Sequence, residues 1–159
     1  GKDFLGVEYF ETVRERAFPI AFGTIFAAVG VCHFVFVENL AKIVPPRGTW
    51  GGLWQLPAPF QEQLGITYED YHSYSSGVAE ILGGLWLLAG GLGFTSTTPP
   101  ALVLFLLTIG VTPANLYMFT HDASPGGSVP RLSYPAGHIA RFALQCGLLS
   151  NFWIMVFAP

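Results

Sequence analysis

The sequence of 159 residues is 52% hydrophobic but only 11% charged, whereas soluble domains carry roughly 25% charged residues. Together with a mean hydropathy of +0.50, this deficit excludes an ordinary soluble enzyme and indicates a polytopic membrane protein. The net charge of −3 and the scattered positions of seven Lys and Arg exclude the basic patch of a nucleic-acid-binding protein. The length suits one all-α domain with about four transmembrane helices and their connections.

The most charged stretch, residues 1–17, opens the chain. Its apolar side chains recur at helical spacing, which predicts an amphipathic helical arm on the membrane surface. A solvated tail made helical by charge pairs is the alternative. A transmembrane domain over residues 18–159 is expected to follow, with its first span at about 18–40. Small residues gather on one face of this span: Gly23, Ala27 and Gly30.

A polar connection rich in Pro, Gly and aromatic residues, 41–72, separates the first two predicted spans. Its Pro-Pro pair prevents a continuous helix, and its Trp and Tyr favour the headgroup layer. We therefore expect it to lie on the bilayer surface, with a short helix near 57–64. The second span, 73–94, contains one charge, Glu80, on a stripe of small residues, which places the carboxyl toward protein rather than lipid. That stripe comprises Ser73, Ser76, Gly77, Glu80, Gly83, Gly84 and Gly91, with Leu87 as the bulky exception.

Two further spans, at about 100–120 and 138–158, complete the predicted up-down bundle. The third span contains Pro113, which predicts a kink where nearby Thr side chains satisfy the freed backbone groups. Cys32 and Cys146 both lie in apolar runs. We expect them to be small, buried apolar side chains rather than a disulfide or redox pair.

An up-down bundle places both chain ends on one side of the membrane and the connections 41–72 and 121–137 on the other. Counting residues from the helix ends places the polar side chains in the half that faces these connections. We therefore predict an intramembrane ion pair between Glu80 and Arg141. The predicted cofactor-binding pocket comprises His33, Glu80, Asn115, Arg141 and Gln145.

Two interpretations of this polar network stay open. In the first, it only holds the helices in register. In the second, it is a pocket that binds a quinone head group, a lipid or a pigment such as chlorophyll, with the aromatic connection as its lid.

Short motifs occur in order along the predicted spans: GVCHF at 30–34, IVP at 43–45, SGVAEILGG at 76–84, PANLYM at 113–118 and RFALQ at 141–145. Together they resemble the DoxX-like family of small membrane proteins with a bundle of four helices, over roughly residues 20–157. The family is named from a membrane subunit of a thiosulfate:quinone oxidoreductase. The resemblance implies that the family positions are His33, Glu80, Asn115, Arg141 and Gln145. The redox-active cysteine arrangement needed for thiol chemistry is absent from this sequence.

The sequence favours a non-catalytic accessory or structural subunit of a larger respiratory or photosynthetic membrane complex, because the chain is small and lacks catalytic motifs. The alternative is the membrane subunit of a quinone-linked oxidoreductase, in which Glu80 or His33 moves protons and Arg141 holds the quinone oxygen. A carrier or channel for a small molecule is disfavoured, because most polar residues stop halfway across the membrane.

No catalytic residue and no metal site are predicted, since the four His are dispersed along the sequence. Membrane lipids and subunits of a larger complex are the expected partners, and nucleic acid is not. The expected location is a plastid, mitochondrial or bacterial inner membrane. An organelle follows if the absent initial Met reflects a removed transit peptide.

Overall fold

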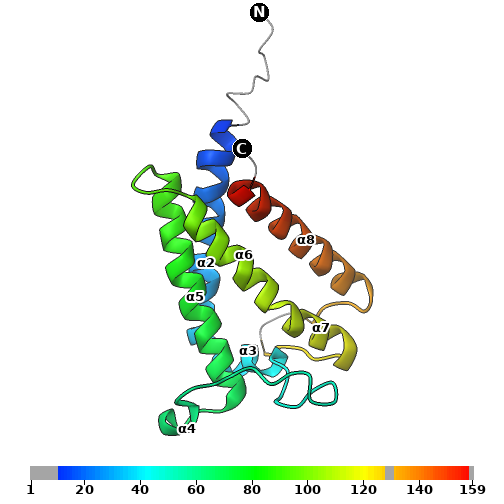
Figure 1. The fold of residues 1–159 in the computed structure, drawn as a ribbon. Coiled ribbons are helices and arrows are strands. Elements are labelled where there is room, and N and C mark those ends of the chain that lie inside the picture. Colours follow the sequence, from blue (N-terminus) through cyan, green and yellow to red (C-terminus); the bar gives the residue numbers. More distant parts are fainter. Residues whose placement is uncertain (1–10, 128–130, 158–159) are drawn as a thin grey trace, which may run out of the picture.

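The computed structural model describes residues 11–127 and 131–157, and within these residues every element is a helix (Figure 1). The all-α prediction is therefore confirmed. In chain order the elements are η1 (Val13–Ala17), α2 (Phe18–Val35), α3 (Val37–Leu40), η2 (Ala41–Ile43), α4 (Gln61–Leu64), α5 (Tyr68–Gly91), α6 (Thr98–Gly110), α7 (Thr112–His121) and α8 (Ala136–Phe157).

Three helical segments of the described chain are long and apolar enough to cross a membrane: Val13–Val35, Thr98–His121 and Ala136–Phe157. They coincide with three of the predicted spans. Most of their large apolar side chains are exposed in the isolated chain, which indicates a protein surrounded by lipid. The remaining predicted span, 73–94, coincides with most of α5.

The N-terminal arm and the first span differ in detail from the prediction. Residues 1–10 of the arm lie outside the described residues, and the rest of the arm continues into α2 as one helix. The predicted span 18–40 is not one helix. It breaks at Phe36, where φ is −119° and ψ is 33°, and α3 begins at the next residue. The polar end of this predicted span is therefore a separate short helix.

Helices α2 and α5 form the most extensive helix pair, because glycines on both let their backbones touch. A Cβ atom added to Gly84 would lie 2.6 Å from the backbone N of Ala27, and one added to Gly23 would lie 2.5 Å from the backbone N of Leu88. Farther along, a Cβ atom at Gly30 would lie 2.7 Å from the carbonyl O of Gly77. The predicted small-residue stripes therefore meet at this interface.

The third predicted span is interrupted at Val111, between α6 and α7, two residues before Pro113. Proline lacks an N–H group and cannot continue the helical hydrogen bonding. Side-chain hydroxyls donate hydrogen bonds to backbone carbonyls near the break. Thr112 Oγ1 donates to the Thr108 carbonyl at 3.2 Å, and Thr108 Oγ1 donates to the Leu104 carbonyl at 2.7 Å. The predicted kink and its Thr side chains are confirmed.

An apolar core lies where α2, α5, α6 and α8 approach one another. It consists of Leu87, Ala101, Leu104, Phe152 and Met155. The rings of Phe22 and Phe26 pack on Phe152 with centroids 5.8 and 5.6 Å away. The start of α2 and the end of α8 lie at one end of the bundle, and the connections before α5 and after α7 lie at the other (Figure 1). We call the second end the loop end.

Candidate functional site

The first polar cluster lies between α2 and α5 and consists of His33, Ser73 and Glu80, which we call the His33 cluster. His33 Nδ1 and Ser73 Oγ are 3.0 Å apart, and His33 Nε2 lies 3.5 Å from Glu80 Oε2. Gly77 permits this arrangement, because a Cβ atom there would lie 2.6 Å from the Cβ atom of His33. The same close approach that joins the two helices therefore positions the imidazole between the hydroxyl and the carboxyl.

The His33 cluster is almost closed to its surroundings. Ser73 is 1% exposed and Glu80 is 7% exposed, and the buried Oε2 atom of Glu80 accepts no hydrogen bond in the described structure. Ser73 is therefore too enclosed to attack a substrate. What the geometry permits is a proton shared or passed along the line from hydroxyl to imidazole to carboxyl.

The second polar cluster joins α6, α7 and α8, and we call it the Gln145 cluster. Arg141 Nε donates to Asn115 Oδ1 at 2.7 Å, and Asn115 Nδ2 donates to Gln145 Oε1 at 2.6 Å. Gln145 Nε2 donates to Thr112 Oγ1 at 2.7 Å and to the Thr108 carbonyl at 3.0 Å. The chain of bonds thus ends on the backbone at the break between α6 and α7, where the Thr108 carbonyl accepts from both Gln145 Nε2 and Thr112 Oγ1.

The predicted ion pair between Glu80 and Arg141 is wrong. Glu80 lies against His33, and the described hydrogen bond of Arg141 goes to Asn115, a neutral side chain. Similar depth in the membrane was the basis of the prediction, but depth does not decide which helices are neighbours. Because α5 packs mainly on α2 and α8 packs mainly on α6, the two charges belong to different interfaces.

The five predicted site residues are all polar groups inside the bundle, yet they form two clusters rather than one pocket. His33 and Glu80 come together in the first cluster, and Asn115, Arg141 and Gln145 come together in the second. Ser73 is a cluster member that sequence reasoning did not select. Its spacing of seven residues from Glu80 on the same stripe was the signal that could have identified it.

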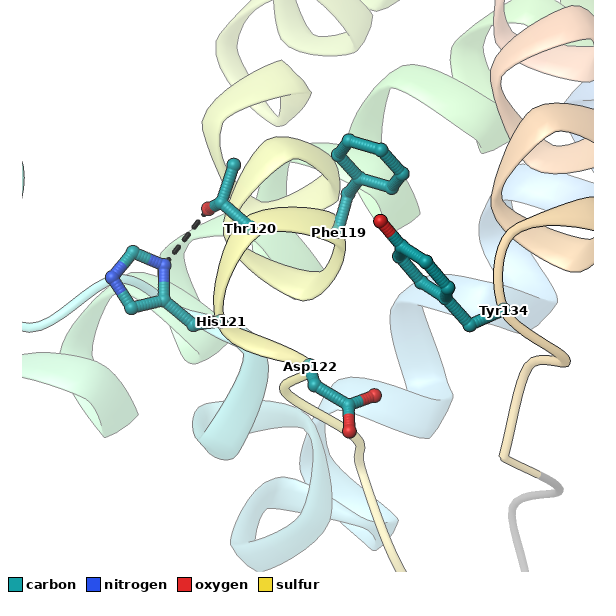
Figure 2. A pocket seen from close by; sticks show the side chains of 5 residues that line it. All are labelled: Phe119, Thr120, His121, Asp122 and Tyr134. Atoms are coloured by element: carbon teal, nitrogen blue, oxygen red, sulfur yellow. Dashed lines mark hydrogen bonds between the residues drawn. The ribbon is translucent and has the colours of Figure 1, made fainter.

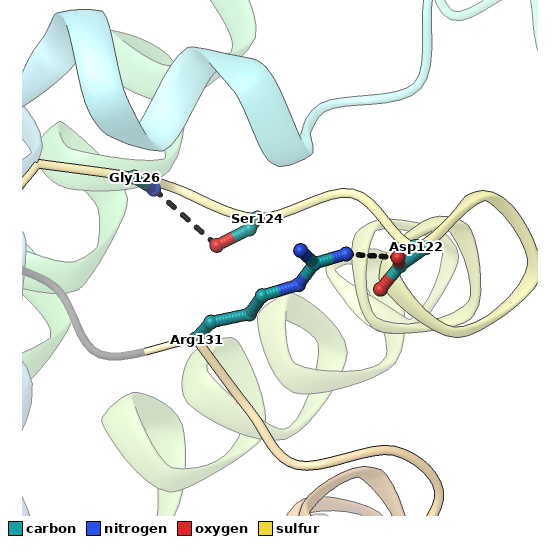
Figure 3. A network of polar contacts seen from close by, with 4 residues as sticks. All are labelled: Asp122, Ser124, Gly126 and Arg131. Carbon is teal, nitrogen blue, oxygen red and sulfur yellow. Dashed lines mark hydrogen bonds and ion pairs between the residues drawn. The ribbon is translucent and has the colours of Figure 1, made fainter.

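A pocket at the loop end lies outside both clusters (Figure 2). It is open, has a volume of about 500 Å³, and is lined by Phe119, Thr120, His121, Asp122 and Tyr134. The rings of Phe119 and Tyr134 stack with centroids 5.4 Å apart. Arg131 forms an exposed ion pair with Asp122, which joins the two ends of the segment after α7 (Figure 3). None of the predicted site residues lines this pocket.

The aromatic connection packs on the first turns of α5 at the loop end. Arg47 lies over the ring of Tyr68 at 4.8 Å, and the Tyr68 hydroxyl donates to the Leu56 carbonyl at 3.3 Å. The rings of Trp54 and His72 meet edge to face, with centroids 6.3 Å apart. These contacts attach the connection to α5. Trp50 of the same connection also meets the rings of Tyr117 and His121 on α7, with centroids 6.4 and 6.3 Å away, so the connection reaches from α5 to α7.

The described residues contain no group of three or more His, Cys, Asp or Glu that could hold a metal ion. Cys32 and Cys146 are free thiols, but Cys32 is half-buried and Cys146 is exposed, so the prediction that both are buried is wrong. Comparison of the chain with protein-family models, curated proteins and solved structures finds no match. The DoxX-like resemblance therefore stays a prediction.

Proposed function

We propose that α5 is a fourth membrane-crossing helix, so that the chain is a multi-pass membrane protein with an up-down bundle. At about 1.5 Å per residue its length exceeds the thickness of a bilayer core. Its outer face is apolar and exposed, with Val78, Leu82, Leu85 and Trp86 on it. Its one central charge, Glu80, faces α2. These features support a helix with one face toward lipid and one toward protein.

We further propose that the protein is a non-catalytic accessory or structural subunit of a larger membrane complex. The observation that carries this proposal is the exposure of apolar side chains outside the crossing helices. In the connection between α3 and α5, Leu53 is 86% exposed, Phe60 is 73% exposed and Leu64 is 62% exposed. Large apolar side chains that are exposed outside the membrane indicate a surface that binds another molecule, because binding removes them from water.

The charges near these side chains favour a protein rather than a bilayer surface as the cover. Glu62 lies between Phe60 and Leu64 on α4, and Glu69 and Asp70 open α5. Bilayer surfaces that carry anionic lipids repel such carboxylates. A protein surface with apolar and basic side chains complements them.

The test is native electrophoresis of membranes from source cells after mild solubilisation. The wild-type chain should migrate with a large complex, and a Leu53→Ser, Phe60→Ser, Leu64→Ser variant should leave it. Phe94→Ser is the matched control, since Phe94 is equally apolar and 83% exposed at the opposite end of α5. A wild-type chain that runs alone at its own mass as a stable monomer would refute the proposal.

A second candidate is the membrane subunit of a quinone-linked oxidoreductase. The observation that favours it is the line from Ser73 through His33 to Glu80, which could deliver protons to a quinone while a partner subunit supplies the electrons. Reduction to the quinol consumes two electrons and two protons, and only the protons would pass through this chain.

Glu80→Gln tests the second candidate, because the amide keeps the shape of the side chain but cannot carry the proton. Quinone-dependent turnover of the intact complex should then be lost while the complex stays assembled. Glu38→Gln on the exposed face of α3 is the control, with turnover unchanged. Full turnover by the Glu80→Gln complex would exclude the candidate.

A further inference from the structure

Arg141 is a cation whose described contact is with a neutral group. It lies on α8 between the buried side chains of His138 and Gln145. Its Nε atom donates to Asn115 Oδ1. Within the described residues, its Nη1 and Nη2 groups make no hydrogen bond or ion pair. The two terminal N–H groups of the guanidinium, which can bind a pair of oxygens, therefore have no partner among the described residues.

The Gln145 cluster fixes the direction of this guanidinium. Gln145 uses both amide hydrogens on Thr112 and Thr108, so its oxygen must face Asn115. Asn115 in turn donates to that oxygen and presents its own oxygen to Arg141. Each amide can bond in only one orientation, and the last bond holds Arg141 by its Nε atom. A group held in this way loses less entropy when it binds a ligand.

The described carboxylates do not balance the charge of Arg141. Glu15 pairs with Arg14, Asp122 pairs with Arg131, and Glu80 lies against His33, so none of these carboxylates contacts Arg141. A guanidinium within a membrane-crossing helix is costly without a counter-charge. Arg141 lies five residues from the start of α8, which is about 7.5 Å along the helix, within reach of the headgroup layer for a long side chain.

We propose that Arg141 is the centre of an oxyanion-binding site at the loop end, for a phosphate or carboxylate group that enters from the membrane surface. Two parallel N–H groups of the guanidinium match two oxygens of such a group. Either an anionic lipid or a small soluble anion presents this chemistry. The site goes beyond the accessory role and does not depend on it, since it needs only the folded chain in a bilayer.

The test uses the purified full chain in nanodiscs and measures ligand retention by native mass spectrometry. Nanodiscs of phosphatidylcholine with added phosphatidylglycerol supply the lipid phosphate, and pure phosphatidylcholine nanodiscs with inorganic phosphate supply the soluble anion. Wild type should bind at least one of the two. Lipid retention identifies a lipid source, and phosphate binding without lipid preference identifies a soluble one.

Arg141→Gln should weaken binding about tenfold, because hydrogen bonds to charged groups are the strongest ones lost. Arg131→Gln is the matched control at the same end of the bundle, and it should bind as wild type does. If Arg141→Gln does not fold, Arg141→Lys keeps the charge but loses the planar fork, and it should still bind more weakly than wild type. Equal binding by wild type and a folded Arg141 variant would overturn the proposal.

Discussion

Between α2 and α5 the backbones touch, whereas between α7 and α8 the side-chain amides do. In the first pair, the absence of side chains at Gly23, Gly30 and Gly84 lets the two backbones come into contact. In the second, Gln145 and Asn115 fill the space and bond across it. A small-residue interface gains from dispersion over its whole length, and an amide network gains from a few directional bonds. The difference shows that one bundle can combine an interface made by continuous backbone contact with an interface made by a few local hydrogen bonds.

The largest effect is expected where a side chain is forced between α2 and α5. Gly84→Ala should lower the free energy of unfolding by about 3 kcal/mol, because its Cβ atom would meet the Ala27 and Gly23 backbones at 2.6 and 2.7 Å. Gly147→Ala on α8 has open space around the added atom and should be neutral or stabilising by up to about 1 kcal/mol. Unfolding by SDS titration from mild detergent measures both. Equal stability of the two variants would show that the backbones do not touch.

Loss of the amide network should have the next largest effect. Gln145→Leu keeps much of the volume but leaves the Asn115 amide without its acceptor and removes the donor to Thr112 Oγ1 and the Thr108 carbonyl, which should cost about 2 kcal/mol in the same titration. Asn151→Ala removes only a bond to the Gly147 carbonyl within α8 and should change stability by less than about 0.5 kcal/mol. If Gln145→Leu lowers the free energy of unfolding more than Gly84→Ala does, the amide network rather than the glycine interface makes the larger contribution to stability.

A single polar bond inside the glycine interface should matter less. Ser73→Ala removes the hydroxyl that bonds His33 Nδ1 and should lower the free energy of unfolding by about 1 kcal/mol. Ser75→Ala, two residues away, removes an exposed bond to the Tyr71 carbonyl of the same helix and should have almost no effect. If the two serine variants unfold alike, the His33 cluster does not contribute to the α2–α5 interface.

The smallest effect is expected at the loop end of the second pair. Arg131→Gln breaks an ion pair whose two side chains are both more than half exposed. Such pairs contribute at most about 1 kcal/mol, and less at high salt. The variant should unfold within about 0.5 kcal/mol of wild type at high ionic strength. A clearly larger decrease in the free energy of unfolding at high ionic strength would show that the connection between α7 and α8 contributes to the stability of this helix pair.

Sequence reasoning was accurate about which faces of the first two predicted spans turn inward. Ser73, Gly77, Glu80 and Gly84 are buried as predicted, because a helical repeat determines the angle of every side chain once the helix is given. Val78 and Leu82 are exposed for the same reason. The break near Pro113 was also predictable, since proline removes a specific hydrogen bond.

Neighbour relations between helices were not predictable in the same way. Glu80 and Arg141 were paired on depth alone, although the order of helices around the bundle decides contacts, and that order depends on packing over whole faces. The break at Phe36 was missed because an apolar run without proline or glycine gives no local sign of a helix end. Ser73 was overlooked because its partner His33 lies 40 residues away.

The glycine contacts between α2 and α5 also impose an order on how the protein is made. Gly23 and its partner Leu88 are separated by more than about 60 residues, and translation proceeds at about 5–20 residues per second. For several seconds after α2 is made, α5 has therefore not yet been synthesised. During this interval the glycine stripe and His33 of α2 face lipid rather than α5. A mutant that slows the emergence of α5 should prolong this interval and make the nascent chain more dependent on membrane chaperones and more open to degradation.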